Sequence, residues 1–308
     1  MSEATVRVIC GPTAAGKSGI AMRLAERLPL AIVSADSRQL YRGFDVGTAK
    51  PTPEERARVP HFGVDVAEPT ERWSAARWAE ACDGWLDAAR ATGREPVVVG
   101  GTGFYLRALA APLFTEPPLE TGRRRALAAA LEALPAGELR RWVERLDPPR
   151  APLGRTQHLR ALEVALLAGR RLSDLHAEGA RAPRHRLRYL VVDPGRDALR
   201  EWIAARTDAM LAAGWLDEVR ALAERVPDDA PAWQGTGYEA IRRHVRGELT
   251  LAEARELVVI ETRQYAKRQR TWFRHQLAGS DVSWLDPRAD GADALAEAWW
   301  HGERNPLA

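Results

Sequence analysis

The sequence predicts an α/β protein with a parallel sheet at its core and an all-helical segment inserted into that core. Short apolar runs alternate with helix-like segments from residue 6 onward. From about residue 119 to Ala180 only helical periodicity is found, and a further apolar run then restores the alternation. Strands that alternate with helices are typical of parallel sheets covered on both faces.

Each element is predicted from its own pattern of apolar residues. Four buried-strand patterns and two helical patterns come before the insert: strands at Val6–Cys10, Ala31–Ser34, Val64–Val66 and Pro96–Val99, and helices at Lys17–Leu28 and Trp73–Arg90. The elements predicted after it are strands at Leu187–Val192 and Val282–Leu285, helices at Arg196–Ala213, Trp215–Arg225 and Leu251–Leu277, and a short terminal helix. We therefore expect a core formed by residues 1–118 and 187–308, with a helical domain at 119–186 inserted between two strands of one sheet.

Composition excludes several classes of protein. The chain has 308 residues, and Cys10 and Cys82 are its only cysteines, which excludes a disulfide framework and a cysteine-rich zinc site. No apolar run is long enough to span a bilayer, and the first strand leaves no room for a targeting peptide before it. We expect a cytoplasmic protein.

Charge is unevenly distributed along the chain. Residues 119–188 contain 15 arginines and 8 acidic residues, a net charge of +7, whereas the whole chain has a net charge of +3. A basic segment of this kind suggests a surface for an anionic partner, and ordinary solvated helix faces are the alternative. Only Lys17, Lys50 and Lys267 are lysines, and all three lie in the motifs described below.

The first turn contains a phosphate-binding motif. Residues 11–18 fit G-x-x-x-x-G-K-[ST] between a strand and a helix, which is the context that a P-loop requires. The motif consists of Gly11, Pro12, Thr13, Ala14, Ala15, Gly16, Lys17 and Ser18. Loop N–H groups and the helix N-terminus favour a phosphate, Lys17 adds a positive charge, and Ser18 is a candidate Mg²⁺ ligand. The motif does not distinguish ATP, GTP and an organic diphosphate.

Two further turns are expected at the same edge of the sheet. Asp36 follows the second strand, and Thr102 follows the strand that ends at Gly100 and Gly101. Loops at the carboxyl ends of parallel strands line the ligand crevice of such folds. Asp36 is a candidate general base or metal ligand there, and a turn or helix-capping carboxylate is the alternative. Lys50 supplies a further positive charge close in sequence.

A basic stripe is predicted on one helix near the C-terminus. Arg263, Lys267, Arg270 and Arg274 are spaced by four, three and four residues, so they lie on one helix face. Like charges in this arrangement repel each other, which favours a nucleic-acid backbone over a plain solvated face. Trp272 and Phe273 either pack in the core or stack on bases.

Together these stretches resemble the bacterial tRNA dimethylallyltransferases, also called tRNA isopentenyltransferases. The matching stretches are Gly11–Ser18, Asp36–Tyr41 with Gly47–Pro51, Gly100–Leu106, Gln157–Glu163 and Thr262–Arg274. They cover almost the whole chain in the family's order. Four positions depart from the family pattern: Ala15, Phe62 with Gly63, His158 and Glu239.

The resemblance implies a P-loop NTPase-like sheet core, an inserted helical domain that binds tRNA, and a defined reaction. Dimethylallyl diphosphate would be the donor and Mg²⁺ the cofactor. The acceptor would be the N6 amine of adenine 37, in the anticodon stem-loop of tRNAs that read codons starting with U. The product would be N6-dimethylallyladenosine. We expect a monomer with no obligate protein partner.

The resemblance also assigns residues. Asp36 would accept the amine proton, Thr102 would line the reaction channel, and Lys17 with Arg206 would hold the diphosphate. The residues that match tRNA-contacting stretches of the family are Asp36, Ser37, Arg38, Gln39, Thr102, Gln157, His158, Leu159, Arg160, Ala161, Gln234, Gly237, Tyr238, Lys267, Arg268, Gln269, Arg270 and Arg274.

Three other functions fit parts of the pattern. A small-molecule P-loop kinase would need a nucleoside triphosphate and has no evident use for the basic helix. An adenylate isopentenyltransferase would modify free adenine nucleotides. A non-catalytic RNA-binding module would use only the insert and the basic helix.

Overall fold

The computed structural model describes residues 5–111, 119–178, 185–277, 279 and 281–302. The chain divides into two compact units, one formed by residues 1–110 with 184–308 and the other by 111–183. The insert predicted from sequence ran from 119 to 186. The predicted domain end at residue 118 and the end of the helical pattern near Ala180 lie outside the described residues.

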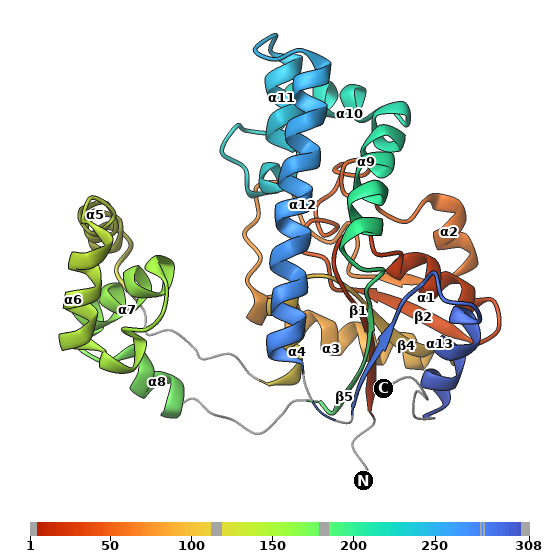
Figure 1. Cartoon of the computed structure of the whole chain (residues 1–308), viewed down its shortest axis with the longest axis horizontal. Helices are drawn as coiled ribbons and strands as arrows, with labels where there is room; N and C mark the ends of the chain where they lie inside the picture. Colours follow the sequence, from red (N-terminus) through yellow and green to blue (C-terminus); the bar gives the residue numbers. More distant parts are fainter. Residues whose placement is uncertain (1–4, 112–118, 179–184, 278, 280, 303–308) are drawn as a thin grey trace. The chain divides into compact units, whose positions relative to one another are not determined.

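A six-stranded parallel sheet forms the centre of the larger unit, with strand order β3-β2-β4-β1-β5-β6 (Figure 1). Its strands are β1 (Val6–Cys10), β2 (Leu30–Ser34), β3 (His61–Phe62), β4 (Glu95–Gly100), β5 (Leu187–Val192) and β6 (Val282–Leu285). Ile9 of β1 lies in register between Val99 of β4 and Leu190 of β5. The strands before and after the inserted unit therefore meet at the centre of one sheet.

The third strand was predicted in the wrong place. Residues 64–66 are not a strand, and β3 is His61–Phe62 instead. Gly63 and Asp65 have φ values of 73° and 57°, which break an extended backbone on both sides of Val64. The Val66 N–H donates to the carbonyl of Leu40, so this segment forms a turn against the loop after β2.

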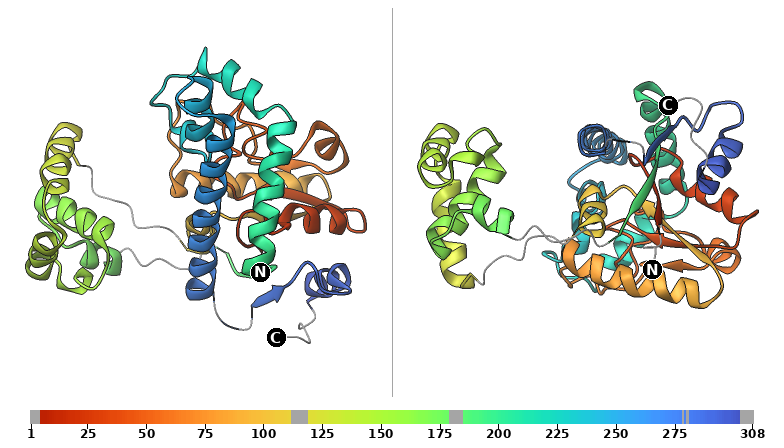
Figure 2. Two further views of the ribbon diagram at one scale, coloured as in Figure 1. Left: turned by 45° about the horizontal axis from the view of Figure 1, so that its top comes forward. Right: turned by 90° about the horizontal axis from the view of Figure 1, so that it is seen from below.

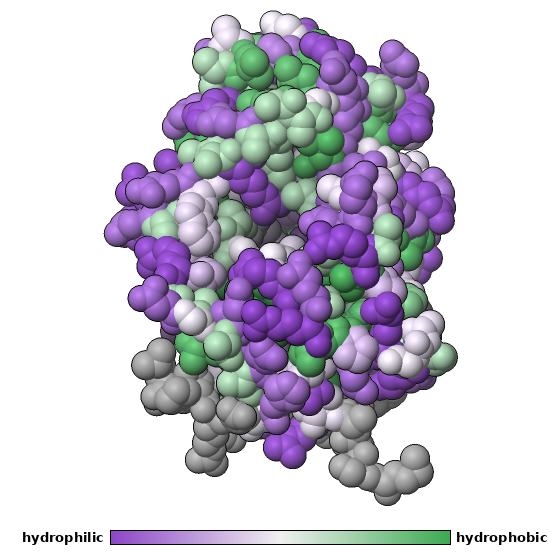
Figure 3. All heavy atoms as spheres, turned by 90° about the vertical axis from the view of Figure 1, so that its right-hand side faces the viewer, coloured by the Kyte–Doolittle hydropathy of each residue, from purple (hydrophilic) through white to green (hydrophobic). Residues whose placement is uncertain are grey.

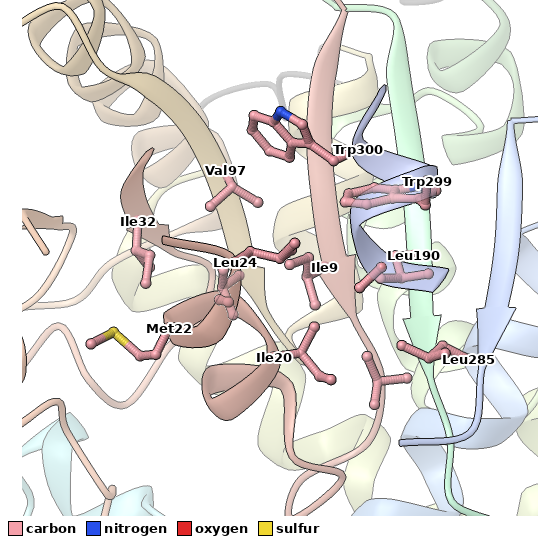
Figure 4. Close-up of a cluster of buried hydrophobic side chains, with 14 of the residues drawn as sticks. Ile9, Ile20, Met22, Leu24, Ile32, Val97, Leu190, Leu285, Trp299 and Trp300 are labelled. Carbon is pink, nitrogen blue, oxygen red and sulfur yellow. The ribbon is translucent and has the colours of Figure 1, made fainter. Parts of the chain in front are cut away.

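Helices α1 (Lys17–Ala25) and α13 (Ala292–His301) cover one face of the sheet. Figure 4 shows Ile9, Leu190 and Leu285 of the strands packed against side chains of these helices. The indole Nε1 of Trp299 donates to the Tyr189 carbonyl at 3.1 Å. The buried terminal helix thus closes the core beneath the strand that follows the insert.

Helix α3 (Ala75–Ala91) packs against β2 and β4, next to α4 (Gly103–Ala110). Trp78 of α3 is fully buried, stacks on Tyr105 at 4.6 Å, and donates its indole N–H to the Ser34 carbonyl. The buried indole fixes the end of β2, from which the Asp36 loop departs.

The remaining helices of this unit lie around the carboxyl edge of the sheet. They are α2 (Pro53–Arg58), α9 (Arg196–Ala212), α10 (Trp215–Ala223), α11 (Tyr238–Val245) and α12 (Leu251–Gln276). Helices α9 and α12 pack side by side, as Figures 1 and 2 show. None of the described helices is long and apolar enough to cross a membrane.

The smaller unit has a core of its own. Its helices are α5 (Thr121–Glu132), α6 (Ala136–Leu146), α7 (Arg155–Ala168) and α8 (Leu172–Glu178). Leu139, Val143 and Leu162 are fully buried between α6 and α7. The buried Asp147 accepts the Ser173 N–H at 3.1 Å and so ties α8 to the end of α6. No strand occurs in its described part, residues 119–178.

Candidate active site

The loop predicted to bind phosphate, hereafter the phosphate loop, lies between β1 and α1, as the sequence predicted. Gly11 has a φ of 141°, and a Cβ there would lie 2.2 Å from the Val192 carbonyl oxygen, so only glycine fits beside β5. Lys17 Nζ donates to the Pro12 carbonyl at 2.6 Å. Helix α1 begins at Lys17 with no side chain capping its N-terminus. Its first N–H groups have no partner inside the helix and are suited to an anion.

Lys17, Arg206 and Asp36 form one electrostatic group. The pKa of Lys17 is lowered to about 8, mainly by burial and also by the nearby Arg206, whereas Asp36 acts in the opposite direction. Burial also lowers the pKa of Arg206, and Asp36 again opposes that shift. Two partly desolvated cations beside one carboxylate leave positive charge for an anionic ligand.

Asp36 lies on a loop that is tied to the second glycine turn. Its Oδ1 accepts the Arg38 N–H at 2.8 Å, which holds the carboxylate in a tight turn. Thr102 Oγ1 accepts the Ser37 N–H at 3.1 Å, and the Thr102 N–H donates to the Ala35 carbonyl at 3.2 Å. Strands β2 and β4 therefore bring Asp36 and Thr102 together at one edge of the sheet, as expected.

Two cavities meet at Asp36 and Arg206. One of about 440 Å³ is lined by the phosphate loop, and the other of about 230 Å³ lies towards α10 and α12. Thr13, Asp36, Thr48 and Arg206 line both cavities. Figure 3 shows the face of the molecule that carries α2 and α13, which is hollowed near its middle among mainly hydrophilic side chains. A reactant on each side would meet beside Asp36.

Tyr265 also lines the second cavity, and sequence reasoning missed it. Its hydroxyl lies near Thr102. Burial raises the pKa of Tyr265 to about 12, whereas Thr102 acts to lower it. The Arg268 guanidinium lies 5.8 Å from its ring centroid. At neutral pH the Tyr265 hydroxyl is protonated, so it can orient Thr102 but cannot compete with Asp36 as a base.

Comparison with known proteins identifies the family. The family described as IPP transferase matches residues 39–276, and the one described as isopentenyl transferase matches residues 4–60. A tRNA dimethylallyltransferase of Gloeobacter violaceus is 44% identical over 286 residues, which are 92% of each chain. The chain belongs to the IPP transferase family. A tRNA dimethylallyltransferase of Anaeromyxobacter (strain Fw109-5) is 45% identical over 94% of this chain and 96% of its own.

Solved structures of IPP transferases share the fold. A tRNA isopentenylpyrophosphate transferase of Bacillus halodurans superimposes with a TM-score of 0.69 at 31% identity, covering 97% of this chain and 96% of its own. A eukaryotic dimethylallyltransferase acting on tRNA gives a TM-score of 0.78 at 23% identity, covering 98% of this chain and 81% of its own. The second likeness is evidence for the fold alone. The core is thus the P-loop-like α/β core of this family.

Gln269 in this IPP transferase faces the protein interior. The side chain is 7% exposed, its Oε1 accepts the Thr13 N–H, and its Nε2 donates to the Gly101 carbonyl, both at 2.8 Å. Both amide atoms of Gln269 therefore have protein partners, and its tRNA contact stays a prediction. Sequence reasoning missed this role, since the side chain lies among exposed cations on the same helix.

Helix α12 also packs closely on α4. A Cβ at Gly103 would lie 2.5 Å from the Trp272 ring, and Phe273 is fully buried. Of the two interpretations of these aromatic residues, the structure therefore favours core packing over base stacking.

The loop of residues 44–50 is held by groups that sequence reasoning assigned elsewhere or missed. Lys50 is buried and bonds to the Asp45 carboxylate at 2.6 Å, to Asp65 and to the Tyr41 carbonyl, so its charge is used within the protein. Glu218 accepts the N–H groups of residues 45–47 and the hydroxyl of Tyr238. These bonds fix the wall of both cavities.

The predicted tRNA-binding residues divide by exposure. Exposed ones are Gln157, Gln234, Lys267, Arg268 and Arg274, whereas Ser37, Arg38, Gln39, Leu159, Arg160 and Arg270 are half-buried. The Gln39 amide donates to the Ala49 carbonyl, and Arg160 pairs with Glu163 at 2.6 Å. Gln234 and Arg38 line the second cavity.

Four other residues predicted to contact tRNA are buried in this structure. His158 bonds the Ala151 carbonyl at 3.1 Å, and Tyr238 bonds Glu218 at 2.7 Å. Ala161 lies in the core of the smaller unit, and a Cβ on Gly237 would lie 2.7 Å from Trp215. These positions matched family stretches in which exposed, half-buried and buried residues alternate, and exposure cannot be deduced from a contiguous match.

Proposed function

We propose that this IPP transferase moves the dimethylallyl group of dimethylallyl diphosphate to the N6 amine of adenine 37 in tRNAs that read codons starting with U. The product is N6-dimethylallyladenosine. The observation that supports this most strongly is the position of Asp36, which lines both the phosphate-loop cavity and the cavity beneath Tyr265. A diphosphate on one side and a purine on the other would meet at that carboxylate.

The donor's diphosphate is bound by the phosphate loop. Lys17, Arg206 and the N–H groups at the start of α1 would neutralise the charge that develops on the leaving group. Because allylic diphosphates ionise readily, stabilising this charge and excluding water supply much of the rate.

Mg²⁺ fits the site as a cofactor held mainly by the substrate. Ser18 at the start of α1 lines the phosphate cavity and offers a hydroxyl oxygen. Among described residues no group of three or more His, Cys, Asp or Glu side chains could hold a metal. This agrees with the preference of Mg²⁺ for phosphate oxygens and water with few protein ligands. Bound there, the ion would offset negative charge on the diphosphate.

The transfer step balances without any further reactant. The N6–carbon bond forms as the carbon–oxygen bond to the diphosphate breaks, and the electron pair leaves with the diphosphate. Asp36 accepts the proton that the amine loses. Thr102 and Ser37 hold the Asp36 loop in place through the Thr102–Ser37 bond.

The tRNA would meet the second cavity and the exposed face of α12. Adenine 37 must leave its stack to enter, which costs a few kcal/mol and less in a loop than in a duplex. Gln234, Arg38 and Arg268 line that cavity, and Lys267, Arg268 and Arg274 are exposed on α12. The arginine-rich helical unit, residues 111–183, would supply a second tRNA contact through exposed residues such as Gln157.

A single assay tests the proposal. Purified protein is incubated with labelled dimethylallyl diphosphate, Mg²⁺ and bulk tRNA, and the nucleosides are then separated. Label in N6-dimethylallyladenosine supports the proposal. Label on free AMP without RNA, or phosphate release from ATP alone, would instead indicate an adenylate isopentenyltransferase or a kinase. We further propose a monomer in the cytoplasm, where the buried thiols of Cys10 and Cys82 would stay reduced.

A further inference from the structure

A basic groove lies next to the candidate active site, between helices α9 and α12. It has a volume of about 500 Å³, and apolar side chains of Leu199, Ile203 and Ala266 form its floor. Its polar lining consists of two arginines from α9 and four cations from α12, together with Gln264 and Thr271: Arg196, Arg200, Arg263, Lys267, Arg270 and Arg274.

The protein itself neutralises little of this charge. Asp193, at the end of β5, lies 2.9 Å from Arg270 and 3.8 Å from Arg274. Within the described part of the chain, the other four cations of the groove form no ion pair. Arg263 Nε is also buried without a hydrogen-bond partner. A buried donor without a partner is unfavourable, so Arg263 and the unpaired cations around it are suited to an anionic ligand.

The groove adjoins the cavity that would receive the purine. Ile203 lines both, and on α9 the next turn presents Arg206 to that cavity. The stripe from Arg263 to Arg274 extends about 16 Å along α12 at 1.5 Å per residue. Cations spread over this length match a chain of phosphates better than a single phosphate or diphosphate.

We propose that the groove between α9 and α12 binds a single-stranded segment of the tRNA anticodon loop, with its phosphates on the arginines and its bases over the apolar floor. Apolar or aromatic surfaces flanked by cations are typical of single-strand binding. Arg196, Arg200 and Arg263 become RNA-binding residues that the family resemblance did not assign. This inference rests on the proposed function, since it supposes that tRNA is the acceptor.

The test uses the two α9 arginines, which line the groove but not the reaction cavities. Binding of an anticodon stem-loop RNA is measured for the full-length protein and for Arg196→Gln/Arg200→Gln over a range of salt concentrations. The slope of log K against log salt is negative, and each lost single-strand phosphate contact reduces its magnitude by about 0.7. We therefore expect the magnitude of the slope to fall by about 1.4 in this variant. Affinity should fall about tenfold at low salt. The KM for dimethylallyl diphosphate should not change.

A matched variant separates local contacts from overall charge. Arg27→Gln/Arg90→Gln removes the same charge from two arginines whose structural partners are Glu297 and Asp87, outside the groove. It should keep the wild-type slope, and Arg196→Lys/Arg200→Lys should retain most of the slope lost in the glutamine variant. An unchanged slope in Arg196→Gln/Arg200→Gln, or an equal decrease in the matched variant, would overturn the inference. If wild type transfers no label to tRNA, the proposed function fails, whereas the salt slopes still report on the groove.

Discussion

The Thr13 N–H donates to the side-chain amide of Gln269 at 2.8 Å, so the phosphate loop is anchored to the long basic helix α12. The same amide donates to the Gly101 carbonyl, next to Thr102. A Cβ on Gly101 would lie 2.4 Å from Gln269 Nε2, so glycine permits this approach. One buried side chain thus joins the donor loop, the Thr102 turn and the helix proposed to meet RNA.

Gln269→Ala should weaken both the fold and donor binding. The Thr13 N–H and the Gly101 carbonyl would lose their partners, which costs about 1–3 kcal/mol of unfolding free energy. The phosphate loop would also lose its anchor, so KM for dimethylallyl diphosphate should rise. Urea unfolding and steady-state kinetics measure the two effects.

The neighbouring Gln264→Ala provides the matched control, since Gln264 is exposed on the same helix. It should leave stability and donor KM near wild type. Equal donor KM in Gln269→Ala and Gln264→Ala would show that the bridge does not position the phosphate loop.

The sequence was sufficient for elements with strong local signals. Apolar runs predicted β1 and β5 at their observed bounds, because a strand buried on both faces needs continuous apolar residues. The edge strand β6 was also predicted at its observed bounds, although it is only partly buried. The Gly11–Ser18 spacing predicted the phosphate loop for the same local reason.

One local signal was missed. Helix α2 was not predicted, although Thr52 and Glu55 form a capping box and Pro53 starts the helix.

Features that depend on tertiary packing were not predictable in this way. The bridging amide of Gln269 and the approach of Tyr265 to Thr102 bring together residues more than 150 positions apart. A single sequence contains no signal for such pairs. Burial of His158 and Tyr238 likewise depends on neighbours from other segments.

Asp36→Asn should lower turnover by about 10²–10⁴-fold, the usual effect of removing a general base. The asparagine can still accept the Arg38 N–H, so the turn after β2 should survive. Affinity for an anticodon stem-loop RNA should remain within about twofold of wild type. Single-turnover transfer and RNA binding are the measurements. Turnover equal to wild type would remove Asp36 from the proton-transfer step.

Tyr265→Phe should lower kcat about two- to tenfold, because Thr102 loses a neighbouring hydroxyl whose polar interaction is worth about 0.5–1.5 kcal/mol. The ring remains, so RNA affinity should not change. Because the pKa of Tyr265 is about 12, the pH profile of kcat below pH 10 should keep its shape. Tyr189→Phe, on β5 outside the site, is the control and should leave kcat unchanged. An altered pH profile in Tyr265→Phe would mean that the phenol takes part in proton transfer.

Lys17 should make donor binding weaken as pH rises through about 8. Its pKa in the free protein is about 8, so above that pH the ammonium is neutral and attracts the diphosphate less. The measurement is kcat/KM for dimethylallyl diphosphate from pH 6.5 to 9.5, compared at saturating tRNA. A profile that stays level through pH 9.5 would contradict a lowered Lys17 pKa.

Lys17→Met should unfold at a higher urea concentration than wild type at pH 7, and the difference should narrow above pH 8. Folding lowers the pKa of Lys17 from 10.5 to about 8, so the unfolded chain binds the additional proton between these values. The free energy of unfolding of the wild type therefore rises with pH between about 8 and 10.5. Below pH 8 the folded protein is destabilised because the Lys17 ammonium stays charged while it is partly desolvated. The methionine side chain is uncharged and does not titrate, so Lys17→Met lacks both the destabilisation and its pH dependence. Wild type and Lys17→Met could instead have equal urea midpoints at pH 7 and again at pH 9. That result would show that the Lys17 ammonium is as well solvated in the folded protein as in the unfolded chain.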